Sequence, residues 1–366
     1  MSWRLCYNQY YIMLFFGTKS FLGVDIGTTS IKMVEIANAE KKPTLRNYGW
    51  LETYGYLERL NDAIQTSSLR ILEKDASKLL QFLISQIKPK TNNVVASLPS
   101  FAAFITLVEL PVMTPEDTAK AVVFQARQYI PLPVSEITLD WLKVGERETE
   151  EGAKKQQILL TSVPNERIRS YRSIFKAAGL RLVALEIESF SLSRALVNSD
   201  PTPTILVDIG GRSTNIAVVD KGFWKYNGRT DFAGGSLTQA IASSVNIDVR
   251  RAEELKKRVG LLGAGGEYEL STLMFPYLDV IIDEVRRVRE SYEKEYQGKI
   301  ERIILAGGGA NLLGIENRFT ERLGLPVVKG APFNKISYPP QLEATAGDLG
   351  PSLAVAIGLG VREFLK

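Results

Sequence analysis

Two stretches of the chain share one pattern, in which an apolar run ends at an acidic residue, a short polar turn follows and a second apolar run begins. In the first stretch the apolar runs are 21–25 and 30–36, which predict two strands joined by a tight turn. In the second stretch, 201–222, the first run ends at Asp208 and the second run covers 216–219. Such an internal repeat predicts two similar domains that face each other.

The pattern changes between these two stretches. Residues 104–145 predict a strand, a helix and a strand, and residues 158–164 predict a returning strand after a charged hairpin tip at 146–157. The helix is expected to begin at Thr114, a hydroxyl N-cap that precedes a proline and two acids. With a further helix at 165–180, this block predicts a small α+β subdomain inserted into the first domain.

Helical spacing marks much of the remaining chain. Apolar residues recur three or four positions apart in 76–88 and 277–296, and 247–260 predicts a short helix of mixed charge. A strand, a Gly-rich turn and a helix are expected within 300–324, and a helix of small residues within 346–366. Strands and helices in both halves predict an α/β fold.

Composition restricts the chemistry more than the fold. The chain has 366 residues, so two or more domains are expected, and its net charge of +4 is spread out apart from a basic cluster at 250–258, which does not favour nucleic acid as a partner. It has no histidine, which excludes His-based acid–base catalysis and His metal sites. Cys6 is the one cysteine, so no intrachain disulfide forms and a reducing compartment fits.

The first residues are apolar and aromatic, with Arg4 as their one charge. This apolar run is too short to span a bilayer, and no small-residue cleavage site follows it. We assign 1–15 to an N-terminal extension, in which Met13 is the expected true start and 1–12 an upstream extension. A membrane-surface or crystal-packing segment is the alternative.

Three Gly-rich turns follow apolar strands, at 27–30, 210–214 and 307–311. Backbone N–H groups converge in such turns and bind anions, although one such turn alone is most often no more than a turn. Two of the three begin with a lone acid, Asp25 or Asp208. Because a carboxylate repels phosphate, this combination predicts a Mg²⁺ ion held through its waters by both acids and directly by phosphate oxygens.

The first turn also carries hydroxyl and basic side chains. Thr28, Thr29 and Ser30 offer hydroxyl donors, and Lys32 follows on the second strand, where it can neutralise phosphate charge. An exposed strand lysine without a ligand is the alternative interpretation of Lys32.

These motifs and their order resemble those of the actin-like ATPase superfamily. DIGTTSIK (25–32) is similar to phosphate motif 1, and LVDIGGRSTNIAVVD (206–220) is similar to phosphate motif 2. ILAGGGANLLGIENRF (304–319) resembles the adenosine motif, and GDLGPSLAVAIGLGVRE (347–363) the second connecting helix. The resemblance implies the actin-like ATPase (ribonuclease H-like) fold, with two lobes that each have a mixed β-sheet and helices, and ATP or ADP with Mg²⁺ between the lobes.

Within that superfamily the chain most resembles the PilM family of type IV pilus assembly proteins, which is related to the division protein FtsA. The resemblance runs from about Phe16 to the C-terminus and includes RQYIPLP (127–133) before EITLDW (136–141) in the inserted block. It implies a division of the chain into an N-terminal extension (1–15), subdomain 1A (16–98 and 178–200), inserted subdomain 1C (99–177), subdomain 2A (201–234 and 299–366) and subdomain 2B (235–298).

The resemblance also assigns roles to residues. Hydrolysis requires a group that orients water in line with the γ-phosphate, and Glu188 is the candidate, with Glu186 in reserve; the alternative is that both glutamates only cap a helix or face solvent. Asp25 is the second expected catalytic residue. In the A-E-x-x-K helix, Glu253 is expected to accept from ribose hydroxyls and Lys256 to lie along the purine, with a surface salt bridge as the alternative. Asn311 is expected to be the N-cap of the next helix. The full nucleotide-binding set is Gly27, Thr28, Thr29, Ser30, Lys32, Asp208, Gly210, Gly211, Ser213, Thr214, Gly234, Gly235, Glu253, Lys256, Gly307, Gly308, Gly309 and Asn311, with Asp25 and Asp208 as the Mg²⁺ residues.

For function, the resemblance implies a cytoplasmic assembly factor that is peripheral at the inner membrane through protein partners and hydrolyses ATP slowly or not at all. The expected partner is the cytoplasmic N-terminal peptide of PilN, bound at a groove and sheet edge that strands around 99–108 and 158–163 are expected to supply with the turn at 129–133. Other pilus platform proteins or motor ATPases, and self-association, are further expected contacts.

Two other classes remain as alternatives. An FtsA-like filament protein that anchors itself needs an amphipathic segment after the last helix, whereas the chain stops at Lys366. A small-molecule kinase needs a catalytic carboxylate in a deep substrate cleft and larger lobes, which the compact size argues against.

Overall fold

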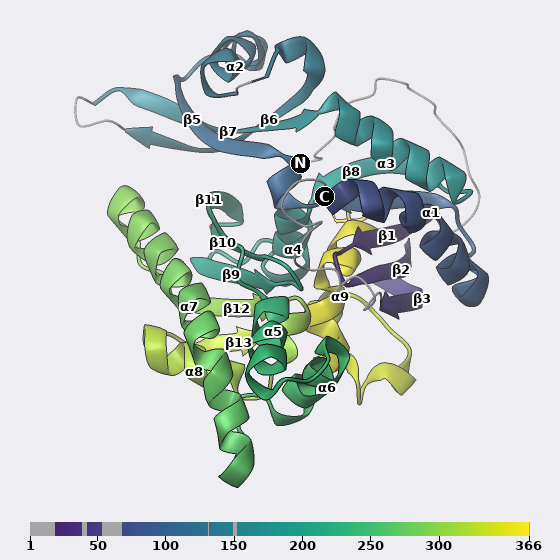
Figure 1. The fold of residues 1–366 in the computed structure, drawn as a ribbon. Coiled ribbons are helices and arrows are strands. Elements are labelled where there is room, and N and C mark those ends of the chain that lie inside the picture. Colours follow the sequence, from purple (N-terminus) through teal and green to yellow (C-terminus); the bar gives the residue numbers. More distant parts are fainter. Residues whose placement is uncertain (1–18, 39–41, 53–67, 131, 149–151, 366) are drawn as a thin grey trace.

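In the computed structural model the described residues form three β-sheets, and helices cover both faces of the two larger sheets (Figure 1). The predicted α/β actin-like fold with two lobes is confirmed. The predicted extension 1–15, the start at Met13 and the boundary at Phe16 lie outside the described residues. The structure describes residues 19–38, 42–52, 68–130, 132–148 and 152–365.

The sheet of lobe 1 is an antiparallel three-stranded meander with two parallel strands added at one side. Strand β2 is buried along nearly its whole length, and helices α1 and α3 cover one face through apolar residues such as Leu80 and Phe175. In sheet order the strands are β3 (Pro43–Glu52), β2 (Ser30–Asn38), β1 (Ser20–Ile26), β4 (Asn93–Leu98) and β8 (Arg181–Ile187), and the two helices are α1 (Ser68–Ile87) and α3 (Asn165–Ala177).

The sheet of lobe 2 repeats this topology, as the sequence repeat predicts. The turn between its first two strands is closed by a hydrogen bond from Gly210 N to Ser213 O (3.1 Å), and the matching bond in lobe 1 runs from Gly27 N to Ser30 O (2.9 Å). In sheet order the strands are β11 (Phe223–Thr230), β10 (Thr214–Asp220), β9 (Thr204–Ile209), β12 (Arg302–Ala306) and β13 (Val327–Lys329), and the helices are α5 (Gly234–Val245), α6 (Val249–Val259), α7 (Tyr268–Tyr296) and α8 (Ile315–Leu323).

Two helices, α4 (Glu188–Leu196) and α9 (Ala346–Gly360), lie between the sheets and join the lobes. All residues of α9 from Gly350 onward are buried, and Leu359 shares one core cluster with Val95 of lobe 1 and Leu206 of lobe 2. A Cβ at Gly23 of β1 would overlap the helix backbone, so the strand and α9 approach closely. The small-residue composition of 346–366 therefore serves helix-to-sheet packing on two sides.

A third sheet lies between β4 and β8 in the chain and has the order β5-β7-β6; we call it the inserted sheet. Because β7 is paired on both sides, the prediction that 158–163 supplies a free sheet edge is wrong, and β5 and β6 form the edges. The hairpin tip is also shorter than predicted, since β6 runs to Glu148. The elements are β5 (Phe104–Pro111), α2 (Pro115–Tyr129), β6 (Ile137–Glu148) and β7 (Lys154–Pro164).

Helix α2 begins as predicted, because the Thr114 hydroxyl accepts a hydrogen bond from Asp117 N (3.2 Å). Helix α7 starts nine residues before the predicted 277 and contains Pro276 in its interior. Buried Met274 and Leu278 flank this proline, so packing offsets the one backbone hydrogen bond that it removes. The exact limits of the predicted domain ranges are not tested and stay predictions.

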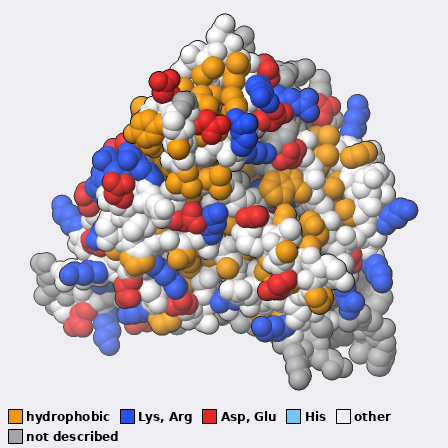
Figure 2. Space-filling model, turned by 90° about the horizontal axis from the view of Figure 1, so that it is seen from below, with side chains coloured by type: hydrophobic (Ala, Val, Ile, Leu, Met, Phe, Trp, Pro, Cys, Tyr) orange, Lys and Arg blue, Asp and Glu red, His pale blue; other side chains and the backbone are white. Residues whose placement is uncertain are grey.

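No described helix has both the length and the apolar content needed to cross a membrane. On the face seen in Figure 2, basic and acidic side chains are interspersed, with apolar side chains between them. The spread of charge that the sequence predicts is therefore visible on this face.

Candidate functional site

The two predicted phosphate turns meet between the lobes. A Cβ at Gly211, in the β9–β10 turn, would lie 2.7 Å from Thr29 Cγ2 and 2.9 Å from Thr29 Oγ1, in the β1–β2 turn. A larger residue there would push against the Thr29 side chain, because the lobe 2 turn lies directly against the lobe 1 turn. The two turns are the matching parts of the two copies of the internal repeat. Residues about 180 positions apart in sequence thus form one site.

Asp25 lies at the end of β1 and is 8% exposed. Its Oδ1 accepts a hydrogen bond from Ser97 Oγ of β4 (2.8 Å), and its Oδ2 lies 3.7 Å from Lys32 Nζ. Lys32 is 9% exposed and also lies over the Trp50 ring, 5.6 Å from its centroid. The alternative of an exposed strand lysine is therefore wrong, and Lys32 is the counter-charge of Asp25.

Asp208 lies at the matching position of β9, against the third turn. A Cβ at Gly307 would overlap Asp208 Oδ1 and the Ile209 carbonyl, and Gly307 has a φ of 77°, which favours glycine. Burial raises the pKa of Asp208 above its ordinary value, Lys32 opposes that shift and Asp25 adds to it. The backbone of the third turn therefore packs directly against the Asp208 carboxyl group.

Glu188 is the first residue of α4 and faces the two aspartates. Its Oε1 accepts hydrogen bonds from Asn215 Nδ2 (2.7 Å) and from Ser100 N (3.0 Å). Burial raises the pKa of Glu188, Asp208 raises it further, the Ser100 N–H lowers it and Asp25 raises it. The site thus gathers three interacting carboxyl groups, an arrangement that favours a neutral Glu188 until a cation is present.

A divalent cation at this site would need ligands beyond the carboxylates of the described residues. Within the described part of the chain, no three Asp, Glu or Cys side chains are arranged to hold a metal ion by themselves. Two acids at facing turns suit an ion that keeps its waters and takes other ligands from phosphate. Asn215 Oδ1 is buried without a hydrogen-bond partner among the described residues, so one polar atom of the site remains for a ligand or water.

Glu186, the reserve for water orientation, does not belong to this site. It is 5% exposed on β8 and forms a bidentate ion pair with Arg194, with Arg362 Nε 3.8 Å away. Two arginines already neutralise this carboxylate, so the prediction of a catalytic role for Glu186 is wrong.

The predicted ribose-side residues do come together. Lys256 Nζ lies 2.6 Å from Glu253 Oε2 and donates to Gly234 O (3.0 Å) and Thr238 Oγ1 (2.8 Å). Burial lowers the pKa of Lys256, while Glu253 raises it. The pair is an i,i+3 salt bridge, as in the alternative interpretation. It is not on the surface, however, because Lys256 is only 9% exposed.

Helix α5 is bonded to the second phosphate turn at its start. Gly234 N donates to Gly210 O (3.0 Å), and Gly235 N donates to Gly211 O (2.8 Å). Lys256, through Gly234 O, therefore connects the A-E-x-x-K helix to that turn. Thr214 does not contribute its hydroxyl to the site, because its Oγ1 donates to Phe232 O (2.8 Å).

Asn311 is not the N-cap of α8. It ends a short 3₁₀ turn (Gly308–Asn311), and Gly314, with a φ of 83°, occupies the cap position before Ile315. The left-handed glycine lets the chain turn three residues later than predicted. Asn311 Nδ2 instead donates to Asp348 O (2.7 Å), at the start of α9.

Three residues of the site were missed by sequence reasoning. Ser97, Asn215 and Thr238 hold Asp25, Glu188 and Lys256 respectively. Asn215 could have been found, because it pairs with Asp208 across the β9–β10 hairpin. Ser97 and Thr238 have no local sequence signal, since tertiary packing alone brings them to their partners.

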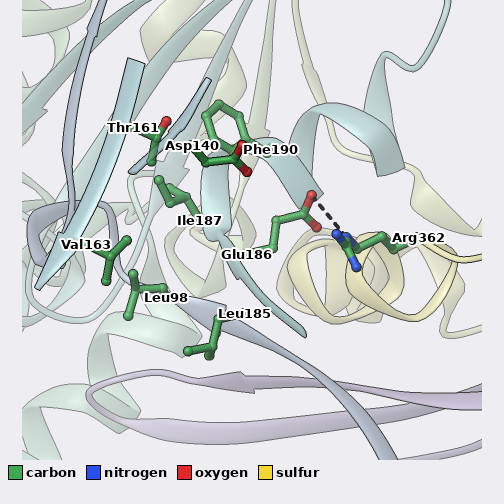
Figure 3. Close-up of a pocket in the computed structure, with 9 residues that line it drawn as sticks. All are labelled: Leu98, Asp140, Thr161, Val163, Leu185, Glu186, Ile187, Phe190 and Arg362. Carbon is green, nitrogen blue, oxygen red and sulfur yellow. Dashed lines mark ion pairs between the residues drawn. The ribbon is translucent and has the colours of Figure 1, made fainter. Parts of the chain in front are cut away.

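A pocket lies beside this site, between lobe 1, the inserted sheet and the end of the chain (Figure 3). Burial raises the pKa of its Asp140 carboxyl to about 6, although the Trp141 N–H and Arg362 lower it. Adjacent residues serve both places: Ser97 binds Asp25 while Leu98 lines the pocket. The lining residues are Leu98, Asp140, Thr161, Val163, Leu185, Glu186, Ile187, Phe190 and Arg362.

The two related lobes, with facing turns at β1 and β9, are those of the actin-like ATPase fold. A structure of MreB5 of Spiroplasma citri bound to ADP has a TM-score of 0.53 to this chain at 15% identity, covering 94% of this chain and 96% of that one. The cell shape-determining protein MreB of Escherichia coli K12 is 26% identical over 194 residues, 44% of this chain and 56% of MreB. The chain thus spans about half the length of the curated relatives it matches.

Within that class, the chain belongs to the type IV pilus assembly protein PilM family, whose sequence profile matches residues 23–364. A solved PilM–PilN type IV pilus biogenesis complex has a TM-score of 0.79 at 24% identity and covers 94% of this chain and 99% of that chain. The predicted resemblance to this family is confirmed.

Proposed function

We propose that this PilM-type assembly protein holds ATP–Mg²⁺ between its lobes and uses the nucleotide as a conformational latch. The observation that supports it most is the direct meeting of the Gly211 and Thr29 turns, each of which follows an acid at a strand end. A nucleotide whose phosphates bind both turns would hold the two lobes together. The MreB5 structure named above contains ADP in a related fold.

In this proposal, Asp25 and Asp208 hold the hydrated Mg²⁺ ion, and the amides of 28–30 and 211–213 receive the phosphates. The cation supplies charge neutralisation when it is bound. Lys32, at 3.7 Å from Asp25, adds a positive charge from lobe 1. Glu253 and Lys256 form the ribose and purine side.

Slow or absent hydrolysis is part of the proposal. Glu188 is the group expected to orient water, but its Oε1 already accepts two hydrogen bonds from the protein, which makes it a weaker acceptor for a proton from water. Two donors on Oε1, from Ser100 and Asn215, also hold it in one orientation. A latch fits these features better than a fast motor does.

We further propose that the pocket of Figure 3 receives the N-terminal cytoplasmic peptide of a PilN protein. The pocket combines apolar walls such as Ile187 and Phe190 with the polar groups of Asp140 and Arg362, which offer a peptide both apolar and charged contacts. The similar solved complex contains PilN together with PilM. The protein would then act at the cytoplasmic face of the inner membrane through such partners, with other platform proteins, motor ATPases or further copies of itself as additional contacts.

Titration calorimetry of the whole chain tests both parts. We expect ATP to bind in the presence of Mg²⁺ and to lose most of its affinity in excess EDTA, and we expect the PilN N-terminal peptide to bind with one site. Absence of nucleotide binding contradicts the latch, and absence of peptide binding contradicts the pocket assignment. A phosphoryl transfer to sugars or acetate in a coupled assay would instead favour a small-molecule kinase.

A further inference from the structure

A buried lysine connects lobe 2 to the inserted sheet. Lys225 lies on β11, the edge strand of the lobe 2 sheet, and is 9% exposed. Its Nζ donates to Val144 O of β6 (2.8 Å) and to Gln157 Oε1 of β7 (3.2 Å). One ammonium group therefore binds both strands of the inserted hairpin.

The surroundings of Lys225 make this contact specific. The two acceptors are a neutral carbonyl and a neutral amide oxygen, and the Phe223 and Tyr296 rings lie 5.8 and 5.7 Å from Nζ. Burial lowers the pKa of Lys225, and Asp220 raises it. Because a buried ammonium is costly without its hydrogen bonds, small displacements of the hairpin are opposed.

The hairpin is shaped to receive this lysine. The β6–β7 register shifts between Lys143 and Gly145, so Val144 is the extra residue of a bulge, and such a residue stands outside the regular ladder. Gly145, which pairs with Gln157, lies at the same point, and a Cβ there would be 2.9 Å from Lys225 Nζ. A bulge and a glycine therefore make room for one side chain from another lobe.

The clamped strands also form one wall of the pocket. Asp140 and Thr161 are direct partners across β6 and β7, and both line the pocket. They lie four residues from Val144 and Gln157, or about 13 Å along each strand. The opposite wall, with Leu98 and Ile187, belongs to β4 and β8 of lobe 1 (Figure 3).

We propose that Lys225 is a positioning residue that fixes the inserted sheet against lobe 2 and thereby sets the width of the pocket between that sheet and lobe 1. A movement of lobe 2 then moves β6 and β7 as one piece. The effect on a peptide rests on the proposed function, because it assumes that the pocket is the partner site.

Double electron–electron resonance (DEER) distance measurements on the spin-labelled full-length chain test this positioning role directly. Labels at Gln128→Cys on α2 and Arg250→Cys on α6, in a Cys6→Ser background, report the position of the inserted part relative to lobe 2. We expect a single narrow distance peak in the parent and its loss in Lys225→Met. Gly145→Ala keeps the lysine but crowds its ammonium, and should broaden the peak as well.

Lys221→Met, an exposed lysine in the β10–β11 turn, is the matched control and should leave the peak unchanged. A lysine that only stabilises lobe 2 would lower the melting temperature and leave the distances intact, so unchanged distances in both Lys225→Met and Gly145→Ala overturn the proposal. Peptide titration of the same variants should show about a tenfold loss of affinity. A parent that binds no peptide would refute the pocket assignment, while the distances would still decide the role of Lys225.

Discussion

At the scale of single residues, the site depends on side chains that hold the charged groups in place. Asp25, Glu188 and Lys256 each have a hydrogen-bond partner that is distant in sequence, namely Ser97, Asn215 and Thr238. Hydrogen bonds to charged groups stabilise more than neutral ones, and a buried charge that loses its partner is penalised. Substitutions of Ser97, Asn215 or Thr238 should therefore change the stability of the site, as substitutions of the charged residues should.

Ser97→Ala removes the hydroxyl that donates to buried Asp25. We expect a loss of about 2 kcal/mol in the free energy of unfolding, because the carboxylate keeps its desolvation cost without that bond. Urea unfolding measures the change. Ser85→Ala is the control, since that exposed hydroxyl on α1 donates only to Phe82 O in its own helix. Equal stability of the two variants would show that Ser97 does not hold Asp25.

Asp140 predicts a dependence of stability on pH. Its pKa is raised from 3.8 to about 6 in the folded chain, so the folded state holds a proton that the unfolded state has released between these values. The free energy of unfolding is therefore highest below about pH 4 and falls as pH rises to about 6, by about 3 kcal/mol in total.

Urea unfolding across this pH range compares the parent with Asp140→Asn. The variant carries no titrating group at this position, so its stability relative to the parent should rise between pH 4 and pH 6 by about that amount. A constant difference between the two proteins over the range would mean that the Asp140 carboxyl titrates normally.

At the scale of elements, packing of α9 against β1 decides how the lobes are joined. The helix has buried residues on all sides, and its backbone lies directly against Gly23. The same small-residue spacing allows it to approach α4, where a Cβ at Gly358 would overlap Ser191 O. Close approach of backbones therefore replaces the usual interdigitation of large side chains.

Gly23→Ala places a methyl group into the backbone of α9 at Ala356. We expect a loss of about 3 kcal/mol or more in the free energy of unfolding, because neither backbone can yield without moving a lobe. Gly347→Ala, in the first turn of α9 itself, is the control, because an added Cβ there meets no atom within 4 Å. That variant should gain about 0.5–1 kcal/mol from helix propensity. Thermal and urea unfolding of the pair give the comparison, and a Gly23→Ala protein as stable as the control contradicts the packing described.

Much of the fold could be predicted at the element scale, because the strands, the N-cap at Thr114 and the internal repeat all have local signals. The third turn shows where local signals end. Asn311 is a good N-cap by type, yet it ends a 3₁₀ turn, and the next helix begins only after the left-handed Gly314. Likewise, nothing near Glu186 in sequence indicates that Arg194 and Arg362 neutralise it.

At the scale of the whole molecule, the turns of the two lobes meet while the inserted sheet contacts both lobes. Lys257 of α6 also lies 3.4 Å from Glu52 of β3, a half-exposed pair between the lobes that contributes little by itself. The contact of Gly211 with Thr29 depends on how two separate cores dock, which no local pattern in the sequence encodes. A ligand that binds both turns would stabilise this docking by mass action.

We propose that Asp25 and Asp208 together make a Mg²⁺-dependent nucleotide site between the lobes. Calorimetric titration of ATP–Mg²⁺ into the parent, Asp25→Ala, Asp208→Ala and the exposed control Asp283→Ala tests it most directly, with circular dichroism to show that each variant is folded. We expect the parent and Asp283→Ala to bind ATP equally and both site variants to lose Mg²⁺-dependent binding. Unchanged ATP affinity in folded Asp25→Ala and Asp208→Ala would contradict it.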